Sequence, residues 1–209
     1  MVNIELHKKL RSGMRLVDFS FKETLSAGEV LGITGPSGCG KSSLLSMISG
    51  LLPADQSRIS VGDVVVEDTS ANILLRAGER KVMQVFQKPL LFPNMTLLQH
   101  IDYVKDKGLD FDMAYFMEAF ELLDFTTVKP AFLSGGQIQR LALLMALSTD
   151  FSLLLLDEVF TGLDQRLKSV LIPLLVKEVK RREKALILVS HDLQILSEYT
   201  DRILTFPAL

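Results

Sequence analysis

The chain has 209 residues, of which 48% are hydrophobic and 23% are charged, with 23 Lys and Arg against 25 Asp and Glu. This length suits one domain, or one domain with an inserted lobe. The composition excludes a disordered chain, a collagen-like chain and a disulfide scaffold. The formal net charge of −2 gives no sign of nucleic acid or an anionic membrane as a partner.

The mean hydropathy of +0.29 raises the question of a membrane span. The most apolar window, Leu141–Leu156, is interrupted by Ser148, Thr149 and Asp150, whereas a span needs roughly 20 mostly apolar residues. The first ten residues lack the apolar region of a signal peptide. The single cysteine, Cys39, fits a reducing compartment. We therefore expect a cytoplasmic protein without a membrane span.

Strand-like apolar runs alternate with helical patterns, which predicts an α/β fold with a largely parallel sheet. In chain order we expect strands at 14–25, 29–33, 58–67 and 81–86, with a helix at 41–51. Helical periodicity follows over 96–124, within a helical lobe at about 89–150. The alternation then resumes with a strand at 152–156, a helix at 163–183, a strand at 185–190, a helix at 192–199 and a strand at 202–206.

Three helical features carry structural expectations. One apolar stripe has helical spacing and is predicted to be the inner face of a packed helix: Met113, Phe116, Met117, Phe120 and Leu123. Pro173 predicts a kink or a break in the helix at 163–183. The charged run at 177–184 is predicted to be a solvated helix end, whose cations suit the negative end of the helix dipole.

A glycine-rich turn between a strand and a helix matches G-x-x-x-x-G-K-[ST], the P-loop. It comprises Gly35, Pro36, Ser37, Gly38, Cys39, Gly40, Lys41 and Ser42, and Ser43 follows it. Glycines let successive backbone N–H groups point at phosphate oxygens, and the helix N-terminus adds partial positive charge. Lys41 is predicted to reach the β- and γ-phosphates, and the Ser42 hydroxyl to ligate Mg²⁺.

A second anion site is predicted at Leu133-Ser134-Gly135-Gly136-Gln137. Ser134 can cap the helix that follows, and the paired glycines leave backbone N–H groups exposed at its start. Two phosphate-binding helix starts make little sense for one nucleotide in one subunit. They make sense if each serves a different nucleotide across a dimer interface.

Two carboxylates follow the buried apolar strand at 153–156, where ligands bind in open α/β sheets. Asp157 is predicted to hold Mg²⁺, and Glu158 to orient or deprotonate the attacking water. Gln87, after the strand at 81–86, could contact Mg²⁺ or that water. His191, after the strand at 185–190, could touch the γ-phosphate. The turn Gly162-Leu163-Asp164 could line a subunit interface.

Together these motifs resemble the nucleotide-binding subunit of an ABC transporter, over about residues 3–207. GPSGCGKS is similar to the Walker A motif, VFQ at 85–87 to the Q-loop and LSGGQ at 133–137 to the signature. LLLLDE at 153–158 is similar to Walker B, GLD at 162–164 to the D-loop and SHD at 190–192 to the switch histidine. The stretch at 91–101 resembles short bacterial importer subunits.

The resemblance implies a P-loop NTPase fold for one domain, 1–209. Residues 1–88 and 151–209 would form a RecA-like core with N-terminal antiparallel strands, and 89–150 a helical signature lobe. It implies an ATPase that uses Mg²⁺, with catalytic Lys41, Gln87, Glu158 and His191. Two copies would close head to tail, with Ser134–Gln137 and Asp164 of one facing ATP held by the other.

The implied partners are a membrane permease that docks near Gln87–Thr96 and the helical lobe, and a separate substrate-binding protein. No nucleic acid is expected. The implied location is peripheral, on the cytoplasmic face of the inner membrane. Because part of the hydrophobicity would then be an apolar groove covered by the permease, we expect such a groove on the helical lobe.

The sequence departs from the family pattern at a few positions. No aromatic residue stands near position 12 to stack on adenine, and Arg11 is the candidate to stack its guanidinium instead. Val159 replaces the usual proline, and Met145 stands where an arginine is common. Cys39 has two interpretations: a small residue that fits the loop, as is common in the family, or a thiol activated at a helix N-terminus, whose alkylation would block ATP.

Two other functions stay open. A non-transport ATPase of this family is one. Repair ATPases, however, carry a long coiled coil between the P-loop and the signature, and translation factors fuse two such domains, whereas this sequence shows neither feature. A catalytically silent regulatory subunit is the other, and the intact Lys41, Asp157, Glu158 and His191 argue against it.

Overall fold

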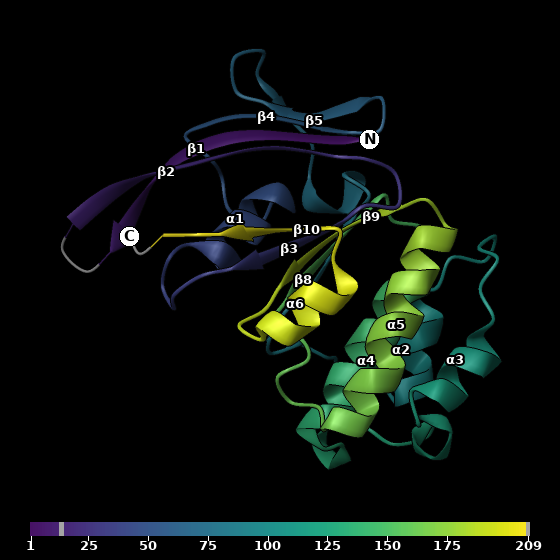
Figure 1. Cartoon of the computed structure of the whole chain (residues 1–209). Helices are drawn as coiled ribbons and strands as arrows, with labels where there is room; N and C mark the ends of the chain where they lie inside the picture. Colours follow the sequence, from purple (N-terminus) through teal and green to yellow (C-terminus); the bar gives the residue numbers. More distant parts are fainter. Residues whose placement is uncertain (13–14, 208–209) are drawn as a thin grey trace.

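The computed structural model of the chain describes residues 1–12 and 15–207, which form two five-stranded sheets and six α-helices (Figure 1). The first sheet has the order β2 (Arg15–Leu25), β1 (Val2–Ser12), β4 (Gln56–Val61), β5 (Val64–Asp68) and β6 (Ile73–Leu74), and its neighbours pair antiparallel. The second has the order β10 (Arg202–Thr205), β3 (Val30–Thr34), β9 (Ala185–Val189), β8 (Leu153–Asp157) and β7 (Val82–Val85), and its neighbours pair parallel. The predicted α/β class is confirmed.

The register of the parallel sheet decides where the site lies. Val85 is level with Leu156, while Asp157 and Ile33 are both level with Val189. The carboxyl ends of β3, β7, β8 and β9 therefore meet at one edge of the sheet. Each of the loops that carry predicted site residues leaves the sheet at this edge.

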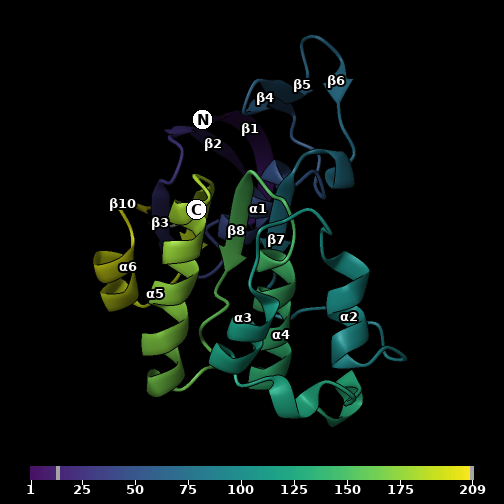
Figure 2. The same ribbon diagram turned by 90° about the vertical axis from the view of Figure 1, so that its right-hand side faces the viewer.

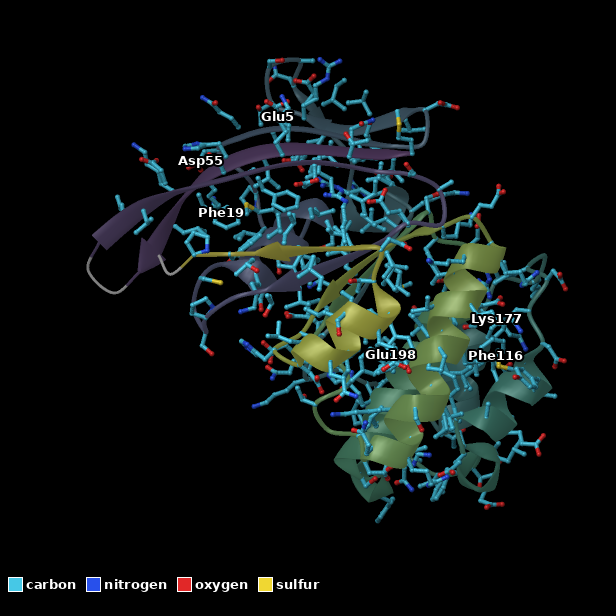
Figure 3. The ribbon with its side chains drawn as sticks, in the orientation of Figure 1. Glu5, Phe19, Asp55, Phe116, Lys177 and Glu198 are labelled. Atoms are coloured by element: carbon cyan, nitrogen blue, oxygen red, sulfur yellow. The ribbon has the colours of Figure 1, made fainter. Side chains whose placement is uncertain are left out.

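Alternate side chains of the parallel strands enter two different cores. Leu153 and Leu155 pack with α1 (Lys41–Ile48) and the inner face of the antiparallel sheet. Leu154 and Leu156 pack with α4 (Gly135–Leu147), α5 (Gln165–Arg181) and α6 (Leu193–Tyr199). The sheet is thus covered on both faces, which explains its continuous apolar strands and much of the high hydropathy. In Figure 3, Phe19 lies between the two sheets and Glu5 on the outer side of the antiparallel sheet.

The helical lobe contains α2 (Leu97–Val104), α3 (Met113–Ala119) and α4, which lie together at the end of the molecule away from the antiparallel sheet (Figure 2). The apolar stripe behaves as predicted at Phe116, Met117 and Phe120, which are buried. Leu123 departs from the prediction because α3 has ended before it, and its side chain is 51% exposed.

A buried arginine ties the antiparallel sheet to the helix that follows the P-loop. The Nη2 atom of Arg80 lies 2.6 Å from Oε2 of Glu67 in β5, and both side chains are almost fully buried. Its Nε donates to the carbonyl of Leu75 at 3.0 Å, and its Nη1 donates to that of Ile48, the last residue of α1, at 3.3 Å. Gly50 leaves room for this guanidinium, since a β-carbon there would lie 2.5 Å from its Nε.

Several expected elements differ in the structure. Strand β1 was not predicted. The single strand predicted at 58–67 is wrong, because the chain turns at Gly62, which has a φ of 61° and lies between β4 and β5.

The prediction of a solvated run at 177–184 is wrong for Glu178 and Arg182, whose side chains are buried and paired at 2.6 Å. The i, i+4 spacing brings both to the packed side of α5, where Arg182 lies over the ring of Phe111. Helix α5 is unbroken through Pro173.

No helix among the described residues combines the length and the apolar character needed to cross a bilayer.

Candidate functional site

The P-loop connects β3 to α1 at the edge where the parallel strands end. Three of its glycines have positive φ values, 150° at Gly35, 80° at Gly38 and 91° at Gly40. A β-carbon would be strained in this backbone. Because Gly40 is also the N-cap of α1 and has no side chain, the first N–H groups of the helix stay open to a ligand. The loop therefore has the geometry that binds a phosphate.

Lys41 is held inside this loop. Its side chain donates to the carbonyl oxygens of Gly35 at 2.8 Å and Pro36 at 2.9 Å, and its Nζ lies 3.7 Å from the Cys39 sulfur. Lys41 is 5% exposed and Cys39 only 2% exposed. The ammonium group is thus positioned at the phosphate-binding loop, whereas the thiol is shielded by it.

Glu158 lies between two of the other predicted catalytic residues. Its Oε2 accepts a hydrogen bond from Nε2 of Gln87 at 3.1 Å, and its Oε1 lies 2.7 Å from Nε2 of His191. The Gln87 loop leaves β7, Glu158 follows β8 and His191 follows β9. The parallel register thus joins three residues that are far apart in sequence.

The backbone at Glu158 is left-handed, with a φ of 51°. The N–H of Glu158 donates to the carbonyl of Val189 at 3.1 Å, and the carbonyl of Glu158 accepts a hydrogen bond from the hydroxyl of Thr161 at 2.9 Å. Such a conformation is costly for a residue with a side chain and persists only where neighbouring contacts impose it. These contacts turn the Glu158 carboxylate towards Gln87 and His191.

Asp157 is buried at the end of β8. Burial raises the pKa of its carboxyl group, and the charge of Glu158 adds to this, whereas a hydrogen bond from Ser42 and the charge of Lys41 oppose it. The Ser42 hydroxyl and the Asp157 carboxylate are oxygen donors of the kind that suit Mg²⁺, which is usually held by one or two carboxylates together with nucleotide phosphates. The predicted metal-binding pair thus fits the ion.

A cavity of about 330 Å³ lies at the mouth of the P-loop. Its lining consists mostly of predicted site residues: Ser37, Gly38, Gly40, Lys41, Ser42, Ser43, Gln87 and Glu158, together with Leu10. Leu10 was not among the predicted site residues, and its apolar side chain can contact a nucleotide base. It is the neighbour of Arg11, whose side chain lies outside the described residues. A larger hollow of about 890 Å³ lies on the outer face of the antiparallel sheet, and no predicted site residue lines it.

The signature residues occupy a different surface. Ser134 is the N-cap of α4, accepting the N–H of Gln137 at 3.2 Å while the Gln137 side chain accepts the N–H of Ser134 at 2.7 Å. Asp164 caps α5 in the same way through the N–H of Leu167 at 2.8 Å. None of these is among the described residues that line the P-loop cavity. The two capped helix starts therefore lie outside the lining of the P-loop cavity.

An apolar hollow of about 180 Å³ lies beside the Gln87 loop, near the place where an apolar groove was expected. It is lined by Met83, Gln84, Val85, Phe86, Pro89, Leu90, Leu91, Val104, Ala142, Met145 and Ala146. Next to it are exposed apolar side chains, with Leu90 94%, Phe92 52% and Tyr103 66% exposed. The apolar surface thus lies where β7 and the loop after it meet the helical lobe, and its coverage by a partner stays a prediction.

His100 of α2 holds the loop that carries these apolar side chains. Its ring is fully buried, and its Nε2 accepts the N–H of Phe92 at 2.9 Å. Its Nδ1 lies 2.8 Å from the carbonyl oxygen of Thr96, so that nitrogen must carry the proton. The Phe92 ring stacks on the imidazole. No local sequence pattern predicts this position of His100, because its contacts depend on a loop that folds back on the helix.

The model of the ABC transporter family matches residues 19–161. The molybdenum import ATP-binding protein ModC of Mycobacterium tuberculosis is 34% identical over 200 residues, covering 91% of this chain and 54% of that protein. The aliphatic sulfonates import ATP-binding protein SsuB 1 of Pseudomonas savastanoi pv. phaseolicola is 33% identical over 205 residues, covering 98% and 79%. The chain spans about half the length of several curated relatives that it matches.

Solved structures agree on the fold. The dimeric structure of the bacterial ABC transporter cassette MJ0796 has a TM-score of 0.82 at 24% identity, covering 99% of this chain and 94% of that one. A post-hydrolysis state of the same cassette, bound to ADP and Pi, gives 0.80 at 24% identity. With its P-loop, signature and paired carboxylates in place, the chain belongs to the ABC transporter family of ATP-binding proteins.

Proposed function

We propose that this chain binds and hydrolyses ATP as the ATPase subunit of a membrane importer. The observation that carries the proposal is the position of Glu158, held by Gln87 and His191 at the rim of the P-loop cavity. A carboxylate in this position can take a proton from a water molecule that attacks a phosphate in the loop. The named relatives are import ATP-binding proteins, which supports the same function.

The P-loop would hold the phosphates of ATP. Lys41 already lies within the loop, and on binding it would exchange the carbonyls of Gly35 and Pro36 for phosphate oxygens. Ser42 and Asp157, with Gln87, would hold Mg²⁺. The ion would supply positive charge against the developing charge on the phosphates.

Glu158 would act as the general base and His191 would contact the γ-phosphate. The hydrogen bond from Gln87 and the contact with His191 fix both oxygens of the carboxylate, so the base is oriented before the nucleotide arrives. A preoriented base lowers the entropic part of the barrier. Leu10 would pack on the base of the nucleotide, with Arg11 as the candidate to stack on it.

A second copy of the chain would complete each site. Ser134–Gln137 and Asp164 lie outside the lining of their own P-loop cavity. The open N–H groups at the start of α4 would bind the γ-phosphate held by the other copy. Head-to-tail closure would then depend on ATP, and hydrolysis would release it.

The apolar surface beside Gln87 is where we expect a permease to dock. Leu90, Phe92 and Tyr103 are exposed, and the hollow beside Leu90 has apolar walls. An exposed apolar patch of this kind is typical of a protein interface. Because Gln87 adjoins both this surface and Glu158, docking can be coupled to the catalytic carboxylate.

The remaining proposals follow from the importer function. The chain would be peripheral, on the cytoplasmic face of the inner membrane, and a separate binding protein would deliver the substrate. The relatives are named for molybdenum, aliphatic sulfonates and sn-glycerol-3-phosphate. The substrate of this importer would be chosen by its membrane and binding-protein partners.

Two measurements test the function. Phosphate release by the purified chain should require both ATP and Mg²⁺, and chelation of the metal should stop it. A tagged chain, recovered from its native membrane in mild detergent, should bring with it an integral membrane subunit that mass spectrometry identifies. Hydrolysis without a membrane partner would favour a non-transport ATPase, and binding of ATP without hydrolysis would favour a regulatory subunit.

A further inference from the structure

Glu121 is held in a left-handed backbone conformation, with a φ of 51°. It follows α3 directly after the C-cap residue Phe120, and the chain there closes a Schellman motif. The N–H of Leu122 bonds to the carbonyl of Met117 at 2.9 Å, and the N–H of Glu121 to that of Glu118 at 2.8 Å. Glycine is the residue that this position favours, because a β-carbon is strained there. A glutamate in this strained conformation therefore suggests that its side chain has a role in the protein.

The Glu121 carboxylate contacts two arginines from different helices. Its Oε1 lies 2.7 Å from Nη1 of Arg166, and its Oε2 lies 3.4 Å from Nη1 of Arg140. The Arg140 side chain is nearly buried and also donates to the carbonyl of Phe120 at 2.7 Å. Both arginines favour the ionised carboxylate, with the hydrogen bond to Arg166 as the main cause of the lowered pKa of Glu121.

The two arginines stand just after the two capped helix starts. Arg140 is on α4, in the turn that follows Ser134–Gln137, and its Nε lies 3.4 Å from the carbonyl oxygen of Gly136. Arg166 is in the first turn of α5, two positions after the N-cap residue Asp164. The backbones also meet, since a β-carbon at Gly136 would lie 3.4 Å from the carbonyl oxygen of Gly162.

We propose that Glu121 is a positioning residue that fixes the Ser134–Gln137 helix start against the Gly162–Asp164 turn through Arg140 and Arg166. The two segments then present one rigid surface to the nucleotide of a second copy. This inference rests on the proposed head-to-tail dimer. It assigns no contact between Glu121 and ATP, and it predicts that the effect of Glu121 falls on turnover and not on binding at its own P-loop.

Two substitutions separate the carboxylate from the backbone. Glu121→Gln keeps the left-handed residue and the size of the side chain but removes the charge. Glu121→Gly removes the carboxylate and relieves the backbone. We expect kcat to fall in both variants, between about threefold and 10²-fold. The Ser134–Gln137 helix start and the Gly162–Asp164 turn would no longer be aligned with the nucleotide held by the second copy. The KM for ATP should stay within about twofold, while Glu121→Gly should unfold at the same urea concentration as the parent chain or higher.

Two further arms test the contact itself. Glu121→Gln combined with Arg166→Gln should lose no more activity than either change alone, because both remove the same contact. Amide hydrogen exchange should accelerate together at residues 134–140 and 162–167 in Glu121→Gly, while the P-loop segment is unchanged.

The outcomes are distinct. If both Glu121 variants match the parent in kcat, or if Glu121→Gly restores the parental kcat and Glu121→Gln does not, the positioning role is wrong. If the parent chain itself does not hydrolyse ATP, the proposed function fails instead. Hydrogen exchange then still tests the positioning role of Glu121. Unchanged exchange at both segments would overturn it, and joint acceleration would support it.

Discussion

The Nε2 atom of His191 lies 2.7 Å from Oε1 of Glu158, and this contact joins the loop after β9 to the loop after β8. The second carboxylate oxygen accepts a hydrogen bond from Gln87, which follows β7. Three strand ends of the parallel sheet are thus connected through one carboxylate. Since Gln87 is next to Phe86 on the apolar surface, a movement of that surface can be passed to Glu158, the proposed base, through a single hydrogen bond.

Replacing Glu158 by Gln should remove basicity and keep the shape of the side chain. We expect phosphate release to fall by about 10²- to 10⁴-fold, the usual contribution of a general base, while binding of a fluorescent ATP analogue persists. The variant should also accumulate as an ATP-bound dimer in size-exclusion chromatography. Glu183→Gln is a matched control, because Glu183 also has a positive φ, 53°, but lies after α5. Parental hydrolysis by Glu158→Gln would show that the base is another group.

Asp157 should make the nucleotide-free chain less stable at neutral pH. Burial raises the pKa of its carboxyl group, so the folded state binds its proton more tightly than the unfolded state. The free energy of unfolding therefore falls as the pH rises from the ordinary value of 3.8 through the raised pKa. Asp157→Asn should raise the urea midpoint at pH 7 without nucleotide.

The same variant should lose its response to the ligand. MgATP at a hundred times its Kd should stabilise the parent by about 2.7 kcal/mol and the variant by clearly less, because Asp157 would hold the metal. Urea titrations with and without MgATP measure both effects. A variant that is less stable than the parent at pH 7, or equally stabilised by MgATP, would contradict the assignment.

Breaking the Arg80–Glu67 pair should strongly destabilise the chain. Arg80→Met leaves the Glu67 carboxylate buried without its partner, and we expect a loss of about 3–5 kcal/mol in the free energy of unfolding. Glu5 and Lys22 form an exposed pair at 2.9 Å, so Lys22→Met is the control and should cost about 0–1 kcal/mol. Equal losses from the two substitutions, measured by urea unfolding, would mean that burial of the Arg80 pair has no energetic effect.

The sequence alone predicts which edge of the parallel sheet carries the proposed catalytic residues. The P-loop motif needs a strand and a helix on either side, and the apolar run before Asp157 predicts a strand that ends at the same edge. Gln87 and His191 were identified in the same way, from the strands that precede them. The sequence does carry a signal for β1, since Val2, Ile4 and Leu6 alternate with polar residues. All three are buried in the structure.

The rest depends on contacts that no local pattern encodes. Arg80 reaches Glu67 only because the β4–β5 hairpin folds over the end of α1. His100 is fixed by a loop, and Glu121 by two helices that the chain reaches later. The charged run near Arg182 was misjudged because its environment is supplied by Phe111, from the helical lobe. Tertiary packing decides these cases and overrides the local charge pattern.

Cys39 should react slowly in the native chain. Its side chain is 2% exposed and its sulfur lies beside Lys41, so a reagent has to wait for the P-loop to open. Labelling by a chromogenic disulfide should be at least about tenfold slower than in urea, where the thiol is free. MgATP should slow it further by holding the loop closed. Because Cys39 is the single cysteine, Cys39→Ser gives the blank. Native labelling as fast as in urea, or no protection by MgATP, would contradict this picture.

Leu90 should be needed for the membrane partner. Its side chain is 94% exposed at the rim of the apolar hollow, and its burial in an interface would contribute about 1.5–3 kcal/mol. Leu90→Asp should therefore weaken capture of the membrane subunit by about 10- to 100-fold. Leu74→Asp is the matched control, because Leu74 is 68% exposed on β6 of the other sheet. Both variants should unfold at the parental urea concentration. If Leu74→Asp lowers the recovery of the membrane subunit as much as Leu90→Asp does, the permease does not dock specifically on the helical lobe, and the apolar surface beside Gln87 needs another occupant.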